Sequence, residues 1–313
     1  MNPVIEDIEV SKRLDGSKLY IRVIRFGKGS PRLLITSSMH GDEATSIAVV
    51  WKIIDFLKVA DLRGSVTLIP SVNPEGLSLL RREEPYSNID INRVYPGSER
   101  GILPERIAYI ISKIALNHDV VLDIHSAGDS IPYIIIHPVE EYDLKDRLYD
   151  LAFSMGITVV ENYPERIYLS RGLNRTLSRF IVDNNIPALT LELAGGRKIN
   201  WLHASIGFKA VLNLMIKLMM IDITPNIITE APVFKERGLR LHDVIVDRAG
   251  IIEEFIELGE YAEKHMDLGV LRDLSGNIIQ RIKADAEGYV IRRCSKSVLY
   301  PYDIAFTLAV RGG

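Results

Sequence analysis

Cysteine is almost absent from this chain, and Cys294 is its one thiol. A single cysteine excludes an intrachain disulfide framework and a zinc site built from several cysteines. Long apolar runs are absent too. The nearest candidate, residues 210–221, is short and is broken by Asn213 and Lys217, so we predict a core helix there and no membrane span. Residues 1–20 lack the apolar core of a signal peptide, and we therefore expect a cytoplasmic protein.

An excess of charge of one sign is also missing. The chain has 38 Lys and Arg against 41 Asp and Glu, a formal net charge of −3, and no block of basic residues stands out. This balance gives no electrostatic case for nucleic-acid binding. With 47% hydrophobic and 25% charged residues, the 313-residue chain has ordinary globular composition and enough apolar side chains for a core. Composition leaves a monomer and a homo-oligomer both open.

A histidine and a glutamate lie three residues apart in the turn His40-Gly41-Asp42-Glu43. The apolar run 33–38 before this turn has the length of a strand, and apolar residues between positions 47 and 57 recur at helical spacing. The turn is therefore expected at the carboxyl end of a strand, where ligands bind in open α/β sheets. Imidazole and carboxylate are a common pair of zinc ligands. The alternative is a polar turn residue followed by a glutamate that favours the first turn of a helix.

Two further predicted strands also carry polar residues near their ends. His125 ends the segment 120–125, and Asp123 points to the same side of that strand, where it could orient a metal ligand or act as a structural carboxylate. Glu192 interrupts the apolar strand 188–193. Because burying an unpaired carboxylate is costly, Glu192 should face a cavity, a cation or a partner, as a general base beside zinc would. The alternative is a strand-end carboxylate in solvent.

Arginines supply candidate groups for binding a substrate acid. Asn92-Arg93 could clamp a carboxylate, because a guanidinium binds one through two parallel hydrogen bonds. A solvated loop arginine is the alternative. Arg171, Arg175 and Arg179 are four residues apart and would share one face of a helix. We choose Arg175 from these as a substrate-binding residue, and the alternative is a solvent-exposed face.

Five segments occur in the order seen in zinc carboxypeptidase-like hydrolases, and over residues 32–200 the chain most resembles the succinylglutamate desuccinylase and aspartoacylase family. The segments are His40-Gly41-Asp42-Glu43, Asn73-Pro74-Glu75-Gly76, Asp90-Ile91-Asn92-Arg93, Asp123-Ile124-His125 and Thr190-Leu191-Glu192. The resemblance implies one zinc ion per chain, held by His40, Glu43 and His125.

The resemblance also assigns roles to residues outside the metal site. It implies that Glu192 is the catalytic glutamate and that Asn92 and Arg93 bind the substrate carboxylate. An upstream arginine would polarise the scissile carbonyl. Arg81 and Arg82 compete for this last role, since the spacing to Asn92 is slightly longer than is usual in the family, and we choose Arg82.

The predicted function is that of a zinc-dependent amidohydrolase, a deacylase that cleaves the non-peptide linear amide C–N bond of a small N-acyl amino acid. Three protein ligands leave a position at zinc for water, whose pKa the metal lowers towards about 7, and Glu192 would accept its proton. One alternative is a zinc metallocarboxypeptidase or related peptidase, which needs an open groove where a deacylase has a cleft narrowed by its β-domain. A second alternative is a non-catalytic, metal-dependent binding protein.

The pattern of elements changes near residue 224. Upstream, strands alternate with helices expected at 105–116, 144–155 and 176–183, which predicts an α/β fold. Downstream, short apolar runs punctuated by glycine predict an all-β module. We divide the chain into a zinc-dependent catalytic domain, residues 1–224, and a C-terminal β-domain, residues 225–313. The resemblance implies a zinc carboxypeptidase-like mixed sheet flanked by helices, and a β-domain shaped like the barrel-sandwich of biotinyl and lipoyl domains.

Overall fold

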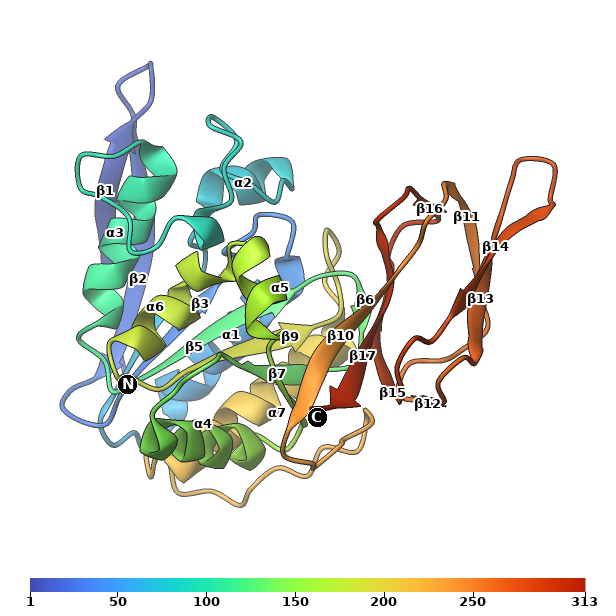
Figure 1. Ribbon diagram of the computed structural model, residues 1–313. Coiled ribbons are helices and arrows are strands. Elements are labelled where there is room, and N and C mark those ends of the chain that lie inside the picture. The colour runs from blue at the N-terminus through green and yellow to red at the C-terminus, as the bar shows by residue number, and fades with distance from the viewer. Residues whose placement is uncertain (313) are drawn as a thin grey trace.

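Strands and helices alternate up to residue 217 of the computed structural model, which describes residues 1–312 (Figure 1). The strands of this part are β1 (Val4–Lys12), β2 (Lys18–Gly27), β3 (Arg32–Ser37), β4 (Ser65–Ile69), β5 (Val120–Ser126), β6 (Asp129–Ser130), β7 (Tyr133–Ile136), β8 (Thr158–Glu161) and β9 (Ala188–Leu193). The helices are α1 (Ala44–Val59), α2 (Pro74–Leu79), α3 (Leu103–Ala115), α4 (Tyr142–Ser154), α5 (Glu165–Ser170), α6 (Leu177–Asp183) and α7 (Trp201–Lys217), with 3-10 turns η1 (Ile91–Arg93) and η2 (Leu173–Arg175). The predicted mixed α/β fold is confirmed.

The remaining part of the chain, from residue 218 to residue 312, contains strands without helices. They are β10 (Leu239–Ile245), β11 (Gly250–Glu254), β12 (Tyr261–Ala262), β13 (Asp267–Arg272), β14 (Ile278–Lys283), β15 (Gly288–Arg293), β16 (Val298–Leu299) and β17 (Ile304–Arg311). Four of them form an antiparallel sheet in the order β14-β13-β11-β16, which Figure 1 shows apart from the helices. The barrel-sandwich form of this module stays a prediction.

The other strands belong to one mixed sheet of 13 strands within residues 1–312. Its order is β1-β2-β4-β3-β5-β9-β7-β8-β10-β17-β15-β12, and β6 pairs with β15. Two pairings link the two parts: a parallel bridge of Arg240 in β10 to Glu161 in β8, and the antiparallel pairing of β15 with β6. The sheet therefore continues across residue 225, and the division of the chain there into two domains stays a prediction.

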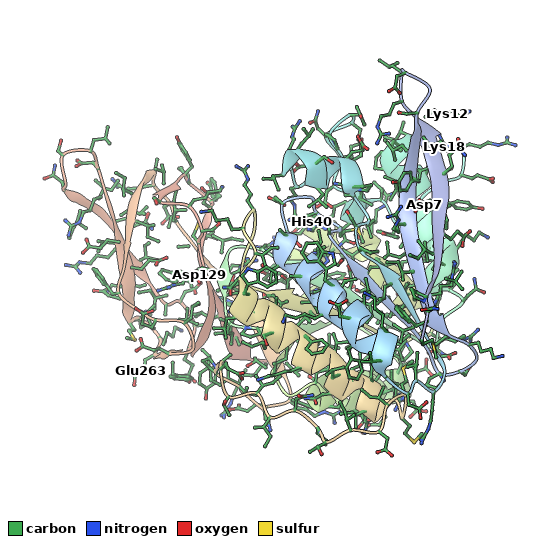
Figure 2. All side chains as sticks on the ribbon, turned by 180° about the vertical axis from the view of Figure 1, so that it is seen from behind. Asp7, Lys12, Lys18, His40, Asp129 and Glu263 are labelled. Atoms are coloured by element: carbon green, nitrogen blue, oxygen red, sulfur yellow. The ribbon has the colours of Figure 1, made fainter. Side chains whose placement is uncertain are left out.

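The neighbouring strands β4, β3, β5 and β9 are parallel to one another, so their carboxyl ends meet at one edge of the sheet. Helices α1, α7 and α4 pack together on one face, while α3 and α6 pack on the other. Figure 2 shows α1 and α7 from behind, with His40 at the amino-terminal end of α1. The order of elements thus brings the predicted metal ligands to the edge where parallel strands end.

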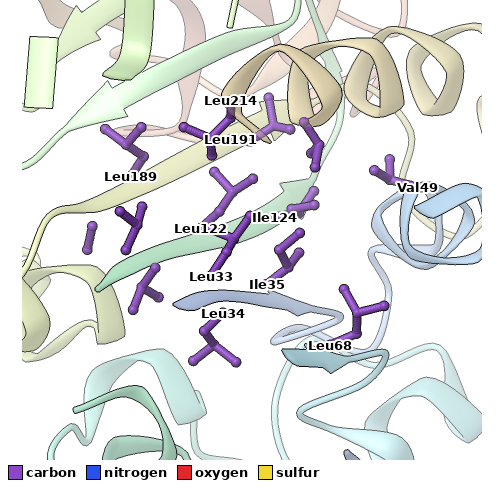
Figure 3. Packing of buried hydrophobic residues seen from close by; sticks show 14 of the residues in the cluster. Leu33, Leu34, Ile35, Val49, Leu68, Leu122, Ile124, Leu189, Leu191 and Leu214 are labelled. Atoms are coloured by element: carbon purple, nitrogen blue, oxygen red, sulfur yellow. The ribbon is translucent and has the colours of Figure 1, made fainter. Parts of the chain in front are cut away.

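Apolar side chains hold these layers together. The strands β3 and β5 are almost wholly buried and β9 largely so, and their leucines and isoleucines meet Val49 of α1 and Leu214 of α7 (Figure 3). Burial on both faces is typical of parallel strands covered by helices. The helix predicted at 210–221 is present but begins earlier, at Trp201, where Asn200 caps it. No helix of residues 1–312 is both long enough and apolar enough to cross a membrane.

Candidate metal and substrate site

The turn His40-Gly41-Asp42-Glu43 connects β3 to α1, as the sequence predicts. The N–H of Glu43 donates to the carbonyl of His40 at 3.2 Å, which closes the turn. Gly41 is needed here, because a Cβ at this position would lie 2.0 Å from the carbonyl carbon of Gly76. The backbone of the Asn73-Pro74-Glu75-Gly76 segment therefore packs directly on the turn and holds both side chains at the sheet edge.

His40, Glu43 and His125 meet in a buried cluster whose ligand atoms all lie within 4.8 Å of one another. Nδ1 of His40 is 2.7 Å from one carboxylate oxygen of Glu43, and Nδ1 of His125 is 3.0 Å from the other. The two Nδ1 atoms are 3.2 Å apart. One nitrogen of each imidazole and one carboxylate thus converge on one point, and this donor set fits zinc with a position left over for a further ligand.

The other nitrogen of each imidazole contacts an aspartate. Nε2 of His125 donates to Asp123 at 2.9 Å, and Nε2 of His40 lies 3.2 Å from Asp90. Thr36 donates to the second oxygen of Asp123 at 2.6 Å. Such contacts orient each ring so that Nδ1 faces the cluster. Asp123 therefore contacts the predicted metal ligand His125, in agreement with the interpretation that it orients a metal ligand. The contact of Asp90 with His40 was not predicted, although Asp90 lies in one of the segments that resemble the family.

Asp90 also joins the metal cluster to two arginines. Its carboxylate is 2.9 Å from Nη2 of Arg82 and 3.7 Å from Nη1 of Arg93. Burial alone would raise the pKa of Asp90, but the hydrogen bond with His40 and the two guanidinium groups outweigh burial and hold this pKa well below its usual range. The carboxylate therefore stays ionised.

Arg82 lies beside the metal cluster, 3.7 Å from Glu43. Arg81 is exposed and donates to Asn88 at 2.8 Å. Of the two neighbours, Arg82 is thus the one that lines the site. This position agrees with the choice made from the sequence.

A cavity of about 190 Å³ lies over these residues. It is lined by His40, Glu43, Arg82, Asn92, Arg93, His125 and Glu192, which are all but one of the residues proposed from the sequence. Arg175 is the exception. Gly172 adopts a left-handed conformation and α5 ends before it, so Arg171, Arg175 and Arg179 do not share a helix face. Arg175 is exposed, and Arg171 lines the cavity instead; the predicted placement of Arg175 is wrong.

Glu192 faces the cavity from β9, between two neighbouring strands. Its register partners are His125 on β5 and Tyr133 on β7, and both line the same cavity. No group of residues 1–312 makes a hydrogen bond to the Glu192 carboxylate, although the side chain is partly buried. Burial raises the pKa of Glu192, against the opposing influence of His125. A carboxylate with a raised pKa and no fixed partner suits a general base.

Several cavity residues were not among the site residues predicted from the sequence. His137 lines the wall and is bonded at both ring nitrogens, to Tyr168 and Thr190 at 3.0 Å each, and burial lowers its pKa to about 3. Leu241 of β10 and Arg292 of β15 reach the cavity from the C-terminal strands. No local pattern marked Arg292, because its strand reaches the cavity through pairings between distant segments.

Residues 29–218 match the family model described as the succinylglutamate desuccinylase/aspartoacylase catalytic domain. The chain belongs to this family. A curated relative is N-alpha-acetyl-L-2,4-diaminobutyric acid deacetylase from Halomonas elongata, which is 31% identical over 140 residues. The match covers 44% of this chain and 41% of the relative, so the chain matches less than half of that protein's length.

Solved structures with the same fold cover nearly the whole chain. A succinylglutamate desuccinylase/aspartoacylase from Rhodobacter sphaeroides has a TM-score of 0.82 at 21% identity, covering 100% of this chain and 97% of that one. The product-bound ectoine utilization protein EutE (DoeB) from Ruegeria pomeroyi has a TM-score of 0.84 at 19% identity, covering 99% and 96%. A metallo-carboxypeptidase from Burkholderia cenocepacia has a TM-score of 0.54 at 14% identity, covering 70% and 65%. These likenesses establish the fold and bear out its expected similarity to carboxypeptidases.

Proposed function

We propose that the protein is a zinc-dependent amidohydrolase that removes the acyl group from a small N-acyl amino acid. The observation that carries this proposal is the convergence of three zinc-type ligands, an unbonded glutamate and a carboxylate-binding arginine in one small cavity. The curated relative from Halomonas elongata is named for the removal of an acetyl group from an amino acid, which supports the same class of reaction.

His40, Glu43 and His125 would hold the zinc ion, with Asp90 and Asp123 orienting the two imidazoles. When bound, zinc supplies a Lewis acid and lowers the pKa of water at the site. Glu192 accepts a proton from the attacking water and afterwards donates it to the departing amine. Burial raises the pKa of Glu192, which makes its carboxylate a stronger proton acceptor.

Asn92 and Arg93 are held so that they can bind the substrate carboxylate. The side-chain oxygen of Asn92 accepts the N–H of Leu177 at 2.9 Å, which leaves its NH₂ group to donate. Nε of Arg93 donates to the carbonyl of Arg171 at 3.1 Å, and Nη1 donates to the carbonyl of Asn92 at 2.8 Å. A guanidinium fixed in this way loses little further freedom when it binds a carboxylate. Arg82, next to the cluster, would stabilise charge that develops on the carbonyl oxygen.

The cavity favours a small substrate over a peptide. Its volume is about 190 Å³, and Leu241 and Arg292 of the C-terminal strands form part of its wall. A peptidase acting on extended chains needs an open groove through which the rest of the peptide can leave. The narrowed cavity agrees with a deacylase, which is why we prefer it to a metallocarboxypeptidase.

The test is to assay the zinc-loaded protein with N-acetyl amino acids and with dipeptides of similar length. We expect hydrolysis of the acetyl compounds and at least about tenfold lower kcat/KM for the dipeptides. Glu192→Gln should keep its zinc and lose at least about 10²-fold in kcat, because an amide cannot accept the proton. Glu253→Gln on the exposed part of β11 is the matched control and should retain full activity.

Three results would change the proposal. Faster cleavage of dipeptides would favour the peptidase. Full zinc occupancy without hydrolysis of either substrate class would favour a metal-dependent binding protein. Undiminished zinc binding in both His40→Ala and His125→Ala would show that the metal assignment is wrong.

A further inference from the structure

Three aromatic rings form a cluster in the C-terminal part of the chain. Tyr261 and Tyr289 are register partners in the neighbouring strands β12 and β15, so their side chains lie on the same face of the sheet (Figure 1). Their ring centroids are 5.1 Å apart, and the angle between the ring planes is 74°. Phe234 stacks on Tyr289, with the two centroids 3.7 Å apart. Rings from three separate segments thus fix one another in place.

A cavity of about 490 Å³ lies beside this cluster. Tyr261 and Tyr289 line it, together with the aliphatic side chains of Leu239 and Val310. The side chain of Tyr261 is 47% exposed, so this ring contributes an accessible surface rather than part of a packed core. No residue that lines this cavity also lines the catalytic cavity. A ligand bound beside the rings would therefore occupy a site of its own.

The charge around this cavity is predominantly negative. Glu236, Glu287 and Arg311 line it, and Nε of Arg311 donates to Glu236 at 3.0 Å, which neutralises that pair. Glu287 has no such partner, since among residues 1–312 no nitrogen of a basic side chain lies within 4.0 Å of its carboxylate. Partial desolvation and the negative charge of Glu287 both raise the pKa of Tyr261, which is the ring that this carboxylate influences. The cavity therefore favours a cation.

The rings indicate which kind of cation fits. The face of an aromatic ring attracts positive charge, and the basic side chains that lie over a ring within residues 1–312 all use rings outside this cluster. A metal ion would need several converging ligands, and the one such cluster in the described part of the chain is the predicted metal site. A bare ammonium is strongly hydrated, whereas methyl groups on the nitrogen can contact both ring faces and aliphatic side chains.

We propose that this cavity binds a small organic cation that carries a methylated ammonium group. The ring of Tyr261 contacts the methyl groups, Tyr289 forms the neighbouring wall, and Glu287 balances the positive charge. This site is independent of the proposed hydrolase function, because the two cavities have no residue in common.

The test is an NMR titration of the full chain with choline. The comparison ligand is the neutral carbon analogue of choline, in which a tert-butyl group replaces the trimethylammonium group. The two molecules have nearly the same shape, so a difference in affinity measures the contribution of the charge. We expect choline to bind saturably and its methyl signal to shift upfield, because the methyl protons lie over a ring. The neutral analogue should bind at least about fivefold more weakly.

Substitutions separate the ring face from the other features of the cavity. Tyr261→Leu should weaken choline binding by at least about fivefold, because leucine keeps apolar contact without an aromatic face, whereas Tyr261→Phe should stay within about twofold of wild type. Glu287→Gln should weaken choline binding by about two- to fivefold and leave binding of the neutral analogue unchanged. Tyr300→Leu is the matched control, since Tyr300 is an exposed tyrosine of the same part of the chain that does not line the cavity. It should bind choline as tightly as wild type does.

Four results would overturn the inference. The first is the absence of saturable choline binding to the wild-type protein, and the second is equal affinity for choline and its neutral analogue. The third is unchanged choline binding in Tyr261→Leu, which would place the ligand elsewhere. The fourth is a Tyr261→Phe variant that binds as weakly as Tyr261→Leu, which would assign binding to the hydroxyl group. If Tyr261→Leu does not fold, Glu287→Gln replaces it, because this side chain is exposed, and an unchanged preference for choline over the neutral analogue would then refute the site.

Discussion

Replacing Asp90 by asparagine tests the link between the predicted metal ligands and the two arginines that we propose bind the substrate. The Asp90→Asn substitution keeps the shape of the side chain and one oxygen, which can still accept the N–H of Asn92, now 2.8 Å away. It removes the negative charge that Arg82 and Arg93 share. A hydrogen bond to a charged group contributes about 1.5–3 kcal/mol, so loss of the Arg82 contact alone should lower kcat/KM by roughly 10- to 100-fold.

The same substitution should weaken metal binding. Nε2 of His40 contacts the same oxygen of Asp90 at 3.2 Å, so the amide keeps an acceptor for the imidazole but removes its negative charge. Complete loss of an outer partner of a metal-binding histidine typically costs about 10- to 100-fold in affinity, and we expect a loss at the lower end of this range. Zinc affinity can be measured by competition with a chromophoric chelator, and kcat/KM on the best N-acyl amino acid. Asp119→Asn is the control, because Asp119 also pairs with an arginine, Arg32 at 2.7 Å, but at the exposed surface.

We expect the control to stay within about twofold of wild type in both measurements, as is usual for exposed ion pairs. If Asp90→Asn also stayed within twofold in both, Asp90 would not position the site, and the geometric argument would fail. A variant that lost activity while keeping full zinc affinity would restrict the role of Asp90 to the arginines.

Substitutions at three further residues test other parts of the site. Arg93→Lys should lower kcat/KM although the charge is kept, because lysine lacks the planar fork of the guanidinium. Amidation of the substrate carboxylate should lower the kcat/KM of the wild-type enzyme far more than that of Arg93→Ala. An equal decrease in both enzymes would show that Arg93 does not bind the carboxylate. Asp123→Ala should weaken zinc binding by about 10- to 100-fold in chelator competition, and unchanged affinity would leave Asp123 a structural role alone. The pKa of His137 is about 3 in the folded protein, against an ordinary value of 6.5 in the unfolded chain. Between pH 7.5 and pH 5 the unfolded chain therefore binds a proton that the folded protein does not bind, which lowers the free energy of unfolding by about 2 kcal/mol. The destabilisation caused by His137→Gln in urea unfolding of the metal-free protein should therefore shrink by about 2 kcal/mol at the lower pH, and a constant difference would contradict the buried neutral state.

The metal cluster could be predicted because its pattern is local. A histidine and a glutamate in one turn need only the turn itself to bring them together, and His125 needs only the rule that parallel strands end at a common edge. Glu192 follows from the same rule, since β9 lies beside β5 in the sheet. The predicted and observed strand ends therefore agree, and the four side chains meet as expected.

The placement of Arg175 failed because spacing by four indicates a shared face only within an unbroken helix. Gly172 takes a left-handed conformation that a glycine adopts at little cost, and it separates α5 from the 3-10 turn that contains Arg175. The sequence shows the glycine but not whether the chain turns there. Arg171, one residue before the break, reaches the cavity instead and pairs with Asp243.

Arg292 could not be placed from the sequence for a different reason. Its strand reaches the cavity because β10 pairs with β8 and β15 with β6, contacts between segments about 80 to 160 residues apart. No local pattern encodes such pairings. The family match ends at residue 218, so it includes the predicted metal ligands and Glu192 but neither Leu241 nor Arg292. The matched segment thus carries the proposed chemistry, while part of the cavity wall comes from strands outside it. A change in those strands can therefore alter the shape of the cavity without touching a predicted metal ligand.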